Sequence, residues 1–196
     1  MKVAIVGGTG TFGRALARRL HGLGYEVFVG SRDATRGRER AIELGVDGGS
    51  NEEGAETARP APGVLEAIAA AELLLVAPSN PFVSIGPILA VAEIRAALER
   101  RRVPAVAVSP LIGGRAVKGP ADAMLARLAG GTTPAHVARC YAGLVDVLVI
   151  DAADEDGADA VADLGMRPVV TRTLMRDEDA RRRLMESMLE AAGAFA

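Results

Sequence analysis

The sequence predicts an α/β fold: a doubly wound (Rossmann-like), mostly parallel sheet of about six strands with helices on both faces. Two observations lead to it. Short apolar runs alternate with helical patterns along the 196 residues, and a glycine-rich turn follows the first run. This alternation is typical of parallel strands joined by right-handed crossover helices. With 49% hydrophobic and 24% charged residues, the chain has enough apolar surface for a core.

Six strands are expected where short apolar, β-branched runs occur, at 2–6, 26–29, 73–77, 104–108, 146–150 and 168–170. Helices are expected at 13–23, 36–44, 64–71, 91–101, 121–128, 134–141, 158–164 and 178–192. In the first of them, Leu16, Leu20 and Leu23 recur at three- and four-residue steps and share one face. Thr133 before Pro134 is a good helix start. The Gly-, Pro- and acid-rich stretch 48–62 is expected to be a loop or junction.

Charge and composition narrow the possible partners. With 23 Lys+Arg against 25 Asp+Glu and 3% aromatic residues, the chain lacks the features of a nucleic-acid binder. One cysteine, Cys140, excludes an internal disulfide, and two histidines leave little for a metal site, so no metal ligands are assigned. No apolar run approaches the roughly 20 residues that cross a bilayer. The start lacks a secretory pattern. We therefore expect no membrane partner and a cytoplasmic location.

The glycine-rich turn is the strongest local motif. Strand 2–6 runs into GTGTFG, the pattern GxGxxG, and then into a helix. Glycines permit the tight turn and the close approach of a pyrophosphate, which the helix N-terminus then attracts. The cofactor-binding residues expected here are Gly8, Thr9, Gly10, Thr11, Phe12 and Gly13. The alternative, a glycine turn that only joins strand to helix, stays open.

The end of the second strand indicates which dinucleotide binds. NAD-binding proteins usually place an acid there to hold the ribose hydroxyls. This chain has Gly30, Ser31 and Arg32 instead. A hydroxyl and a guanidinium suit a 2′-phosphate. NADP(H) is therefore favoured over NAD, with Ser31 and Arg32 among the cofactor-binding residues.

These residues resemble a known family. MKVAIVGGTGTFGRALARRL, GYEVFVGSRD and ELGVDGGSNEEGAETA are similar to the N-terminal part of the NADPH-dependent oxidoreductases that act on the deazaflavin coenzyme F-420. The resemblance covers about the first 58 residues. It implies that Thr9, Ser31 and Arg32 contact NADP. The strand that this family places next is not found after Ala58.

Two later loops carry polar residues directly after expected strands: PSNPFVSIGPIL at 78–89 and SPLIGGRAVKGP at 109–120. Open α/β sheets bind ligands at the carboxyl ends of their strands. Hydroxyls, an amide and free backbone N–H groups suit a phosphate, and Lys118, one of two lysines, adds a point charge. The alternative is that proline and glycine make tight turns, which Ser79 and Ser84 cap.

The second half resembles a different family. GVLEAI, VAPSNPFVSIGPILAV, VAVSPLIGGRAVKGPAD and VIDAAD are similar, in order, to the C-terminal portion of 2-phospho-L-lactate transferases. The resemblance implies transfer of a phospholactyl or phosphoenolpyruvyl group from guanosine diphosphate to the deazaflavin precursor Fo, with release of GMP and help from Mg²⁺. The nucleotide-binding residues it implies are Ser79, Asn80, Ser84, Ile85 and Gly86, with Lys118 and Gly119 nearby. Asp151 and Asp154 match family acids but are interpreted as loop residues at a strand end.

The chain departs from both families. The transferase's N-terminal half, which holds the acids expected to bind Mg²⁺, and the reductase's later half are missing. The chain therefore resembles a splice of residues 1–58 and 59–196. We expect it to merge into one α/β domain, with strand 73–77 beside the first strand.

Three functions stay open: a transferase of coenzyme F-420 biosynthesis, impaired by the missing half; an NADPH:coenzyme F-420 oxidoreductase; and a nucleotide-binding protein without turnover. No catalytic residue is assigned. Guanine nucleotides and deazaflavins are the expected small-molecule partners, and a homodimer is left open. Outside these motifs, Cys140 is expected to be a buried structural thiol, His21 an exposed residue and His136 a packed helix residue.

Overall fold

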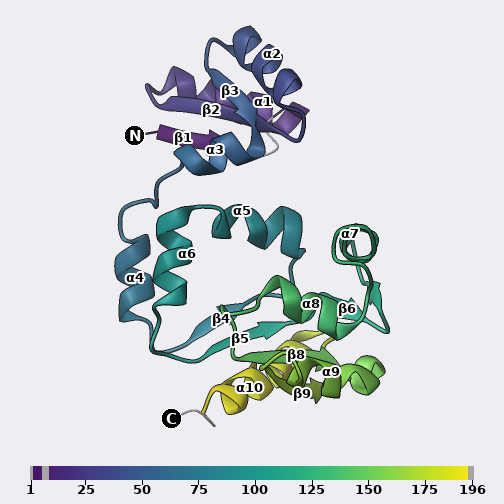
Figure 1. Cartoon of the computed structure of the whole chain (residues 1–196). Helices are drawn as coiled ribbons and strands as arrows, with labels where there is room; N and C mark the ends of the chain where they lie inside the picture. Colours follow the sequence, from purple (N-terminus) through teal and green to yellow (C-terminus); the bar gives the residue numbers. More distant parts are fainter. Residues whose placement is uncertain (1, 6–8, 194–196) are drawn as a thin grey trace. The chain divides into compact units, whose positions relative to one another are not determined.

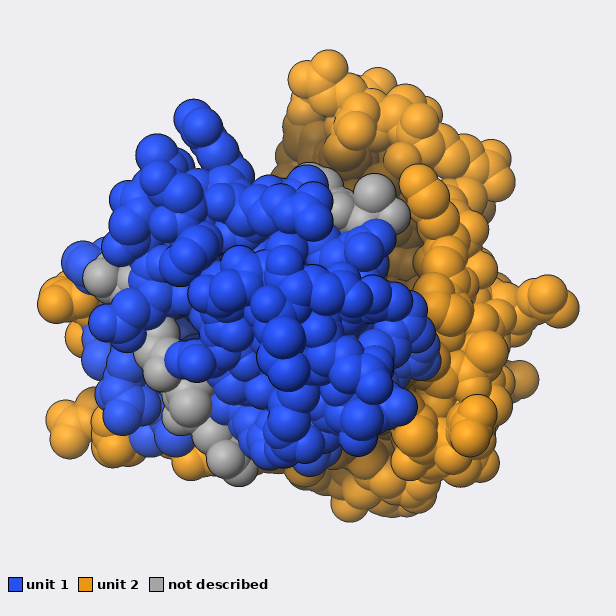
Figure 2. Space-filling view, turned by 90° about the horizontal axis from the view of Figure 1, so that it is seen from above, with its two compact units in different colours: residues 1–65, 86–97 blue, residues 66–85, 98–196 orange. Residues whose placement is uncertain are grey.

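The computed structural model describes residues 2–5 and 9–193. The chain divides into two compact units, which are described separately below. Unit 1 contains residues 1–65 and 86–97, and unit 2 contains residues 66–85 and 98–196 (Figure 2). The boundaries fall within α4 (Val64–Ala70) and α6 (Ala92–Glu99) and just before α5 (Gly86–Leu89). The merging of segments 1–58 and 59–196 into one domain stays a prediction.

Unit 1 is built on a three-stranded parallel sheet in the order β1-β2-β3 (Figure 1). The strands are β1 (Lys2–Ile5), β2 (Glu26–Ser31) and β3 (Asp47–Ser50). The crossovers are α1 (Thr11–Gly22) and α2 (Ala34–Leu44). Asp33 starts α2 because its carboxylate accepts the backbone N–H of Thr35 at 2.9 Å, and Gly45 ends α2 at φ 68°.

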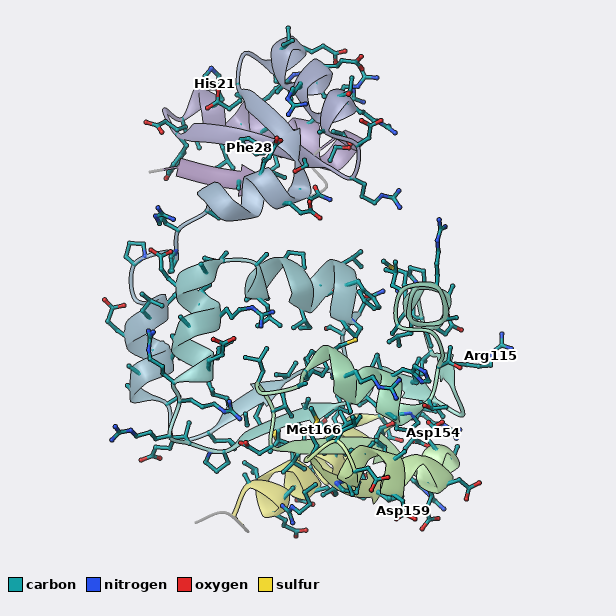
Figure 3. All side chains as sticks on the ribbon, viewed as in Figure 1. His21, Phe28, Arg115, Asp154, Asp159 and Met166 are labelled. Carbon is teal, nitrogen blue, oxygen red and sulfur yellow. The ribbon has the colours of Figure 1, made fainter. Side chains whose placement is uncertain are left out.

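The core of unit 1 lies between this sheet and its crossover helices. Ala17 of α1 and Leu44 of α2 are buried with Val27 and Val29 of β2. Phe28 is buried too, and because side chains alternate along a strand it faces the other side of the sheet. There its ring lies against Gly54 of α3 (Asn51–Thr57) (Figure 3). Both faces of β2 are therefore covered.

The expectation of a loop or junction at 48–62 is wrong for residues 48–57, which contain most of β3 and all of α3, while residues 58–62 form no helix or strand. β3 has the sequence DGGS, which lacks the apolar, β-branched residues typical of strands. Its glycines serve packing instead: a Cβ on Gly48 would collide with Ala41 of α2. α3 begins with a capping box, in which the N–H of Glu53 donates to Ser50 Oγ at 2.9 Å and the N–H of Ser50 donates to Glu53 Oε2 at 2.6 Å.

Unit 2 is built on a four-stranded parallel sheet in the order β4-β5-β8-β9. The strands are β4 (Leu74–Val76), β5 (Ala105–Val108), β8 (Val147–Asp151) and β9 (Arg167–Thr171). All residues of the central strands β5 and β8 are buried. Continuous burial is expected for parallel strands that are covered on both faces.

Helices cover both faces of that sheet. Leu184 and Met188 of α10 (Glu178–Gly193) pack in one cluster with Val106 of β5 and Val147 and Val149 of β8. α8 (Pro134–Cys140) lies over the opposite face (Figure 1). α9 (Ala158–Ala162) packs on β9. The other elements of unit 2 are a π-helix (Pro81–Ile85), α7 (Ala121–Leu128), a 3₁₀ helix (Ala152–Gly157) and the hairpin strands β6 (Leu111–Ile112) and β7 (Arg115–Ala116).

The α/β class with parallel sheets is confirmed, and each of the six expected strands is present. The count of about six strands in one sheet is not confirmed, because the strands divide between two sheets. β4 pairs with β5, through Leu74 opposite Ala105, instead of lying beside the first strand. Within residues 2–5 and 9–193, no single helix is long and apolar enough to cross a membrane. Only the segments Pro81–Leu89 and Ala92–Glu99, taken together across their break, pass that test.

Candidate nucleotide-binding site

The carboxyl ends of the unit 2 strands meet at one edge of the sheet, because all four strands are parallel. A polar residue lies at or just after each end: Asn80 after β4, Ser109 after β5, Asp151 at the end of β8 and Thr173 after β9. Open α/β sheets place ligands at this edge. The topology therefore gathers side chains that lie up to 93 residues apart in the sequence.

A pocket of about 250 Å³ opens at this edge. Its polar lining consists of Asn80, Ser109, Lys118 and Thr173. Its remaining walls are apolar: Pro78, Pro110, Ile112, Val117, Pro120, Ala121, Leu174 and Met175. An apolar pocket with a few convergent polar groups and one cation suits a small anionic ligand that also has an apolar part.

The β6–β7 hairpin carries Lys118 to the pocket. Its turn is Gly113 and Gly114, at φ 58° and 70°, a conformation that glycine adopts without strain. Asp154 locks this turn: its Oδ2 accepts the N–H of Gly113 at 2.9 Å and its Oδ1 accepts that of Gly114 at 2.8 Å (Figure 3). Ser109 Oγ accepts the N–H of Leu111 at 3.2 Å at the other end of the hairpin.

Asp151 fixes the opposite wall. Its Oδ2 accepts both the backbone N–H of Thr173, at 2.8 Å, and the Thr173 hydroxyl, at 2.9 Å. Its Oδ1 accepts the N–H of Ala153 at 3.0 Å. Burial raises the pKa of Asp151, but these hydrogen bonds and the charge of Arg172 outweigh it and hold that pKa below its ordinary value. Asp151 is the last residue of β8 and Asp154 lies in the following 3₁₀ helix, so both lie at a strand end as expected, and their hydrogen bonds position the pocket walls.

Asn80 starts the π-helix. Its Oδ1 accepts the backbone N–H groups of Phe82, at 2.9 Å, and Val83, at 3.3 Å, while its Nδ2 lies 3.4 Å from Met124 Sδ of α7. These contacts hold the amide side chain at the pocket wall. The capping role explains why an asparagine precedes Pro81.

The structure brings together two of the seven nucleotide-binding residues expected in the second half, Asn80 and Lys118. Ser79, Ser84, Ile85 and Gly119 belong to the same two segments but do not line the pocket, and Gly86 belongs to unit 1. Their binding roles stay predictions. Ser109 and Thr173 were missed. Ser109 is the first residue of the polar segment 109–120. Thr173 follows the expected strand 168–170, and parallel strands end at the same edge of a sheet.

The cofactor-binding residues expected in the first half lie at the carboxyl edge of the unit 1 sheet. Gly10 is the N-cap of α1, whose first turn includes Thr11, Phe12 and Gly13, and Thr9 lies in the preceding turn; Gly8 falls outside the described residues. Ser31 ends β2, is buried, and its Oγ accepts the N–H of Asp33 at 3.3 Å. Arg32 is exposed. Because β1 and β2 are parallel neighbours, the turn and Ser31–Arg32 share one edge.

The Mg²⁺ ion that the resemblance implies stays a prediction for this chain. No group of three or more His, Cys, Asp or Glu side chains that could hold a metal occurs in the part of the chain that the structure describes. The acids nearest the pocket, Asp151 and Asp154, already accept the hydrogen bonds given above.

The three remaining candidates have structural roles. Cys140 is half-buried and not fully buried as expected; burial raises the pKa of its thiol, and its Sγ donates to the carbonyl of His136 at 3.3 Å. His136 Nδ1 lies 2.7 Å from Thr133 Oγ1 in the capping box of α8. His21 is exposed on α1 (Figure 3).

Comparison with known proteins decides the family. The family model "2-phospho-L-lactate transferase CofD" matches residues 43–187. The chain belongs to this transferase family. A second model, "NADP oxidoreductase coenzyme F420-dependent", matches residues 2–77, so both resemblances are confirmed and the two matches overlap at 43–77.

Curated relatives of this transferase-family chain cover its C-terminal part. The phosphoenolpyruvate transferase of Streptomyces griseus is 44% identical over 140 residues, 71% of this chain and 44% of the relative. The 2-phospho-L-lactate transferase of Methanocaldococcus jannaschii is 34% identical over 138 residues, 70% of this chain and 43% of the relative. The chain thus spans less than half the length of these relatives.

Proposed function

We propose that the chain acts in coenzyme F-420 biosynthesis by binding a guanosine diphosphate-linked three-carbon acid in the pocket of Asn80, Ser109, Lys118 and Thr173. The observation that carries this proposal is the position of Lys118: an ammonium group lines a ligand pocket at the carboxyl edge of the sheet, inside the region matched by the transferase model. The relatives' names supply the group transferred, phosphoenolpyruvate or 2-phospho-L-lactate.

Phosphoryl transfer asks a protein mainly to position the reactants and to neutralise charge. In such a transfer the acceptor hydroxyl oxygen bonds to phosphorus, the phosphorus–oxygen bond to GMP breaks, and the hydroxyl proton is released. The Lys118 ammonium offsets phosphate charge. Ser109 Oγ accepts a hydrogen bond from Leu111, so its own O–H is available to donate to a phosphate oxygen.

Replacement of Lys118 tests this proposal. Lys118→Gln is expected to weaken guanosine diphosphate binding by about tenfold or more, because a charge-assisted hydrogen bond contributes about 1.5–3 kcal/mol. Titration calorimetry on the whole chain measures it. Arg115→Gln is the matched control: it removes a positive charge from the same hairpin, but Arg115 is exposed and does not line the pocket (Figure 3). Wild-type protein that gives no heat with guanosine diphosphate contradicts the proposal.

A second candidate function, binding of NADPH in unit 1, is favoured by the match at residues 2–77. Gly10 caps α1 with no side-chain hydrogen bond, and the first turn of α1 contains no acid, so its N–H groups suit a phosphate. Among the described residues, nothing lies within 4 Å of a Cβ placed on Gly10, so its backbone is open to a ligand on that side. Arg32 is exposed at the same sheet edge and suits the 2′-phosphate of NADPH.

Arg32→Gln is expected to weaken NADPH binding about tenfold and to leave NADH binding unchanged, because only NADPH carries the 2′-phosphate. Nucleotide fluorescence measures both affinities. Arg40→Gln, at a helix position where the guanidinium pairs with Glu43, is the control. Equal losses for NADPH and NADH, or equal losses in the two variants, count against a 2′-phosphate contact at Arg32.

A further inference from the structure

Unit 2 contains a second, larger pocket beside the first. It has a volume of about 450 Å³ and shares Ile112 and Leu174 with the nucleotide pocket, so the two pockets adjoin. Three arginines line it: Arg172 and Arg176 from the segment between β9 and α10, and Arg183 from α10. The proposed transfer reaction assigns no role to this pocket.

The three arginines of the second pocket are exposed, and the charge of Arg172 also acts on the Asp151 carboxylate. In the described part of the chain, no ion pair is formed by Arg172, Arg176 or Arg183. By contrast, the neighbouring Arg182 lies 3.3 Å from Asp179. Like charges that line one pocket repel one another, and an anion between them removes that cost.

Two acids, Asp151 and Asp177, also line the pocket, and both accept hydrogen bonds from neutral donors. Asp151 accepts three hydrogen bonds, from Ala153 and Thr173. Asp177 Oδ1 accepts the backbone N–H of Ala180 at 2.8 Å at the start of α10. Neither carboxylate lies within 4.0 Å of an arginine nitrogen among the described ion pairs, so the guanidinium N–H donors of the pocket are available to a ligand.

We propose that this pocket is a binding site for a phosphate group. A guanidinium presents several N–H donors in a planar fork that matches the oxygens of a phosphate, and three such forks suit a dianion better than a single carboxylate. The phosphate comes from free inorganic phosphate or from a nucleotide that extends past Ile112 and Leu174. The proposal holds whether or not the first pocket binds guanosine diphosphate.

The test measures binding of inorganic phosphate to the whole chain by titration calorimetry at low ionic strength. Arg183→Gln and Arg176→Gln are each expected to weaken phosphate binding at least tenfold. Arg182→Gln is the matched control on the same helix and is expected to change it less than twofold. Phosphate binding that is absent in the wild type, or equally weakened by Arg182→Gln, overturns the proposal. Thermal unfolding shows whether each variant is folded. If one of the two test variants does not fold, the other still tests the proposal.

A second arm identifies the source of the phosphate. Guanosine diphosphate is titrated into wild-type protein with and without saturating inorganic phosphate. If inorganic phosphate weakens guanosine diphosphate binding in the wild type but not in Arg183→Gln, the result supports a nucleotide phosphate bound among the arginines. Unchanged nucleotide binding, together with the phosphate affinity above, supports a separate site for free phosphate.

Discussion

Replacing Asp151 by alanine is expected to lower the free energy of unfolding by about 3 kcal/mol. The carboxylate is buried and accepts hydrogen bonds from the N–H of Ala153 and from the N–H and hydroxyl of Thr173. Thr173 is 5% exposed, so water cannot easily replace the lost acceptor, and each unsatisfied buried donor costs about 1–3 kcal/mol. Urea unfolding at pH 7, followed by circular dichroism, measures the change.

Asp156→Ala is the matched control for this prediction. Asp156 lies in the 3₁₀ helix that follows β8, and it is exposed. Its removal is expected to change the free energy of unfolding by no more than about 0.5 kcal/mol. Comparable losses in the two variants would show that the Asp151–Thr173 contacts do not hold this edge together.

The lowered pKa of Asp151 adds a pH dependence with a definite sign. Its stabilising contribution is complete above the unfolded pKa of about 3.9 and is lost as pH falls through the lower folded pKa. Asp151→Asn has no carboxylate to titrate there. The stability difference between wild type and Asp151→Asn is therefore expected to be largest near neutral pH and to narrow below about pH 4.

Strands were predictable from the sequence where burial determines the residue type. The five residues of β8 and the four of β5 are covered on both faces, and both strands consist mainly of valine, isoleucine, leucine and alanine. β3 was not predictable in this way, because helix α2 lies so close to it that only glycine fits at Gly48. α3 did have a sequence signal, the Ser50–Glu53 capping box, but the surrounding Gly, Pro and acidic residues suggested a loop.

For the candidate site, too, the sequence predicted residues within a local segment but not residues that are brought together by strand order. Asn80 and Lys118 were predictable because each follows an expected strand within a segment rich in proline and glycine. Thr173 contributes through its contact with Asp151, which depends on β9 pairing beside β8. The arginine pocket depends on the path of the chain from β9 into α10, which places Arg172 near Arg183. Strand order and chain path of this kind are not encoded in any local pattern.

Gly37→Ala is expected to lower the free energy of unfolding of unit 1 by about 3 kcal/mol, at the upper end for adding one methyl to a packed site. A Cβ on Gly37 would collide with the carbonyl oxygen of Gly49, which is backbone and cannot turn away as a flexible side chain could. Gly22→Ala is the matched control: Gly22 ends helix α1, and a Cβ there meets nothing within 4 Å.

The two substitutions make the same chemical change in helical glycines and are expected to have opposite signs. Gly22→Ala should stabilise the chain by up to about 1 kcal/mol, because alanine has the higher helix propensity. Urea unfolding followed by circular dichroism at 222 nm suits this comparison, because the chain contains no tryptophan. If Gly37→Ala is as stable as Gly22→Ala, helix α2 does not lie against β3 as closely as the structure requires, and the glycines of β3 need another explanation.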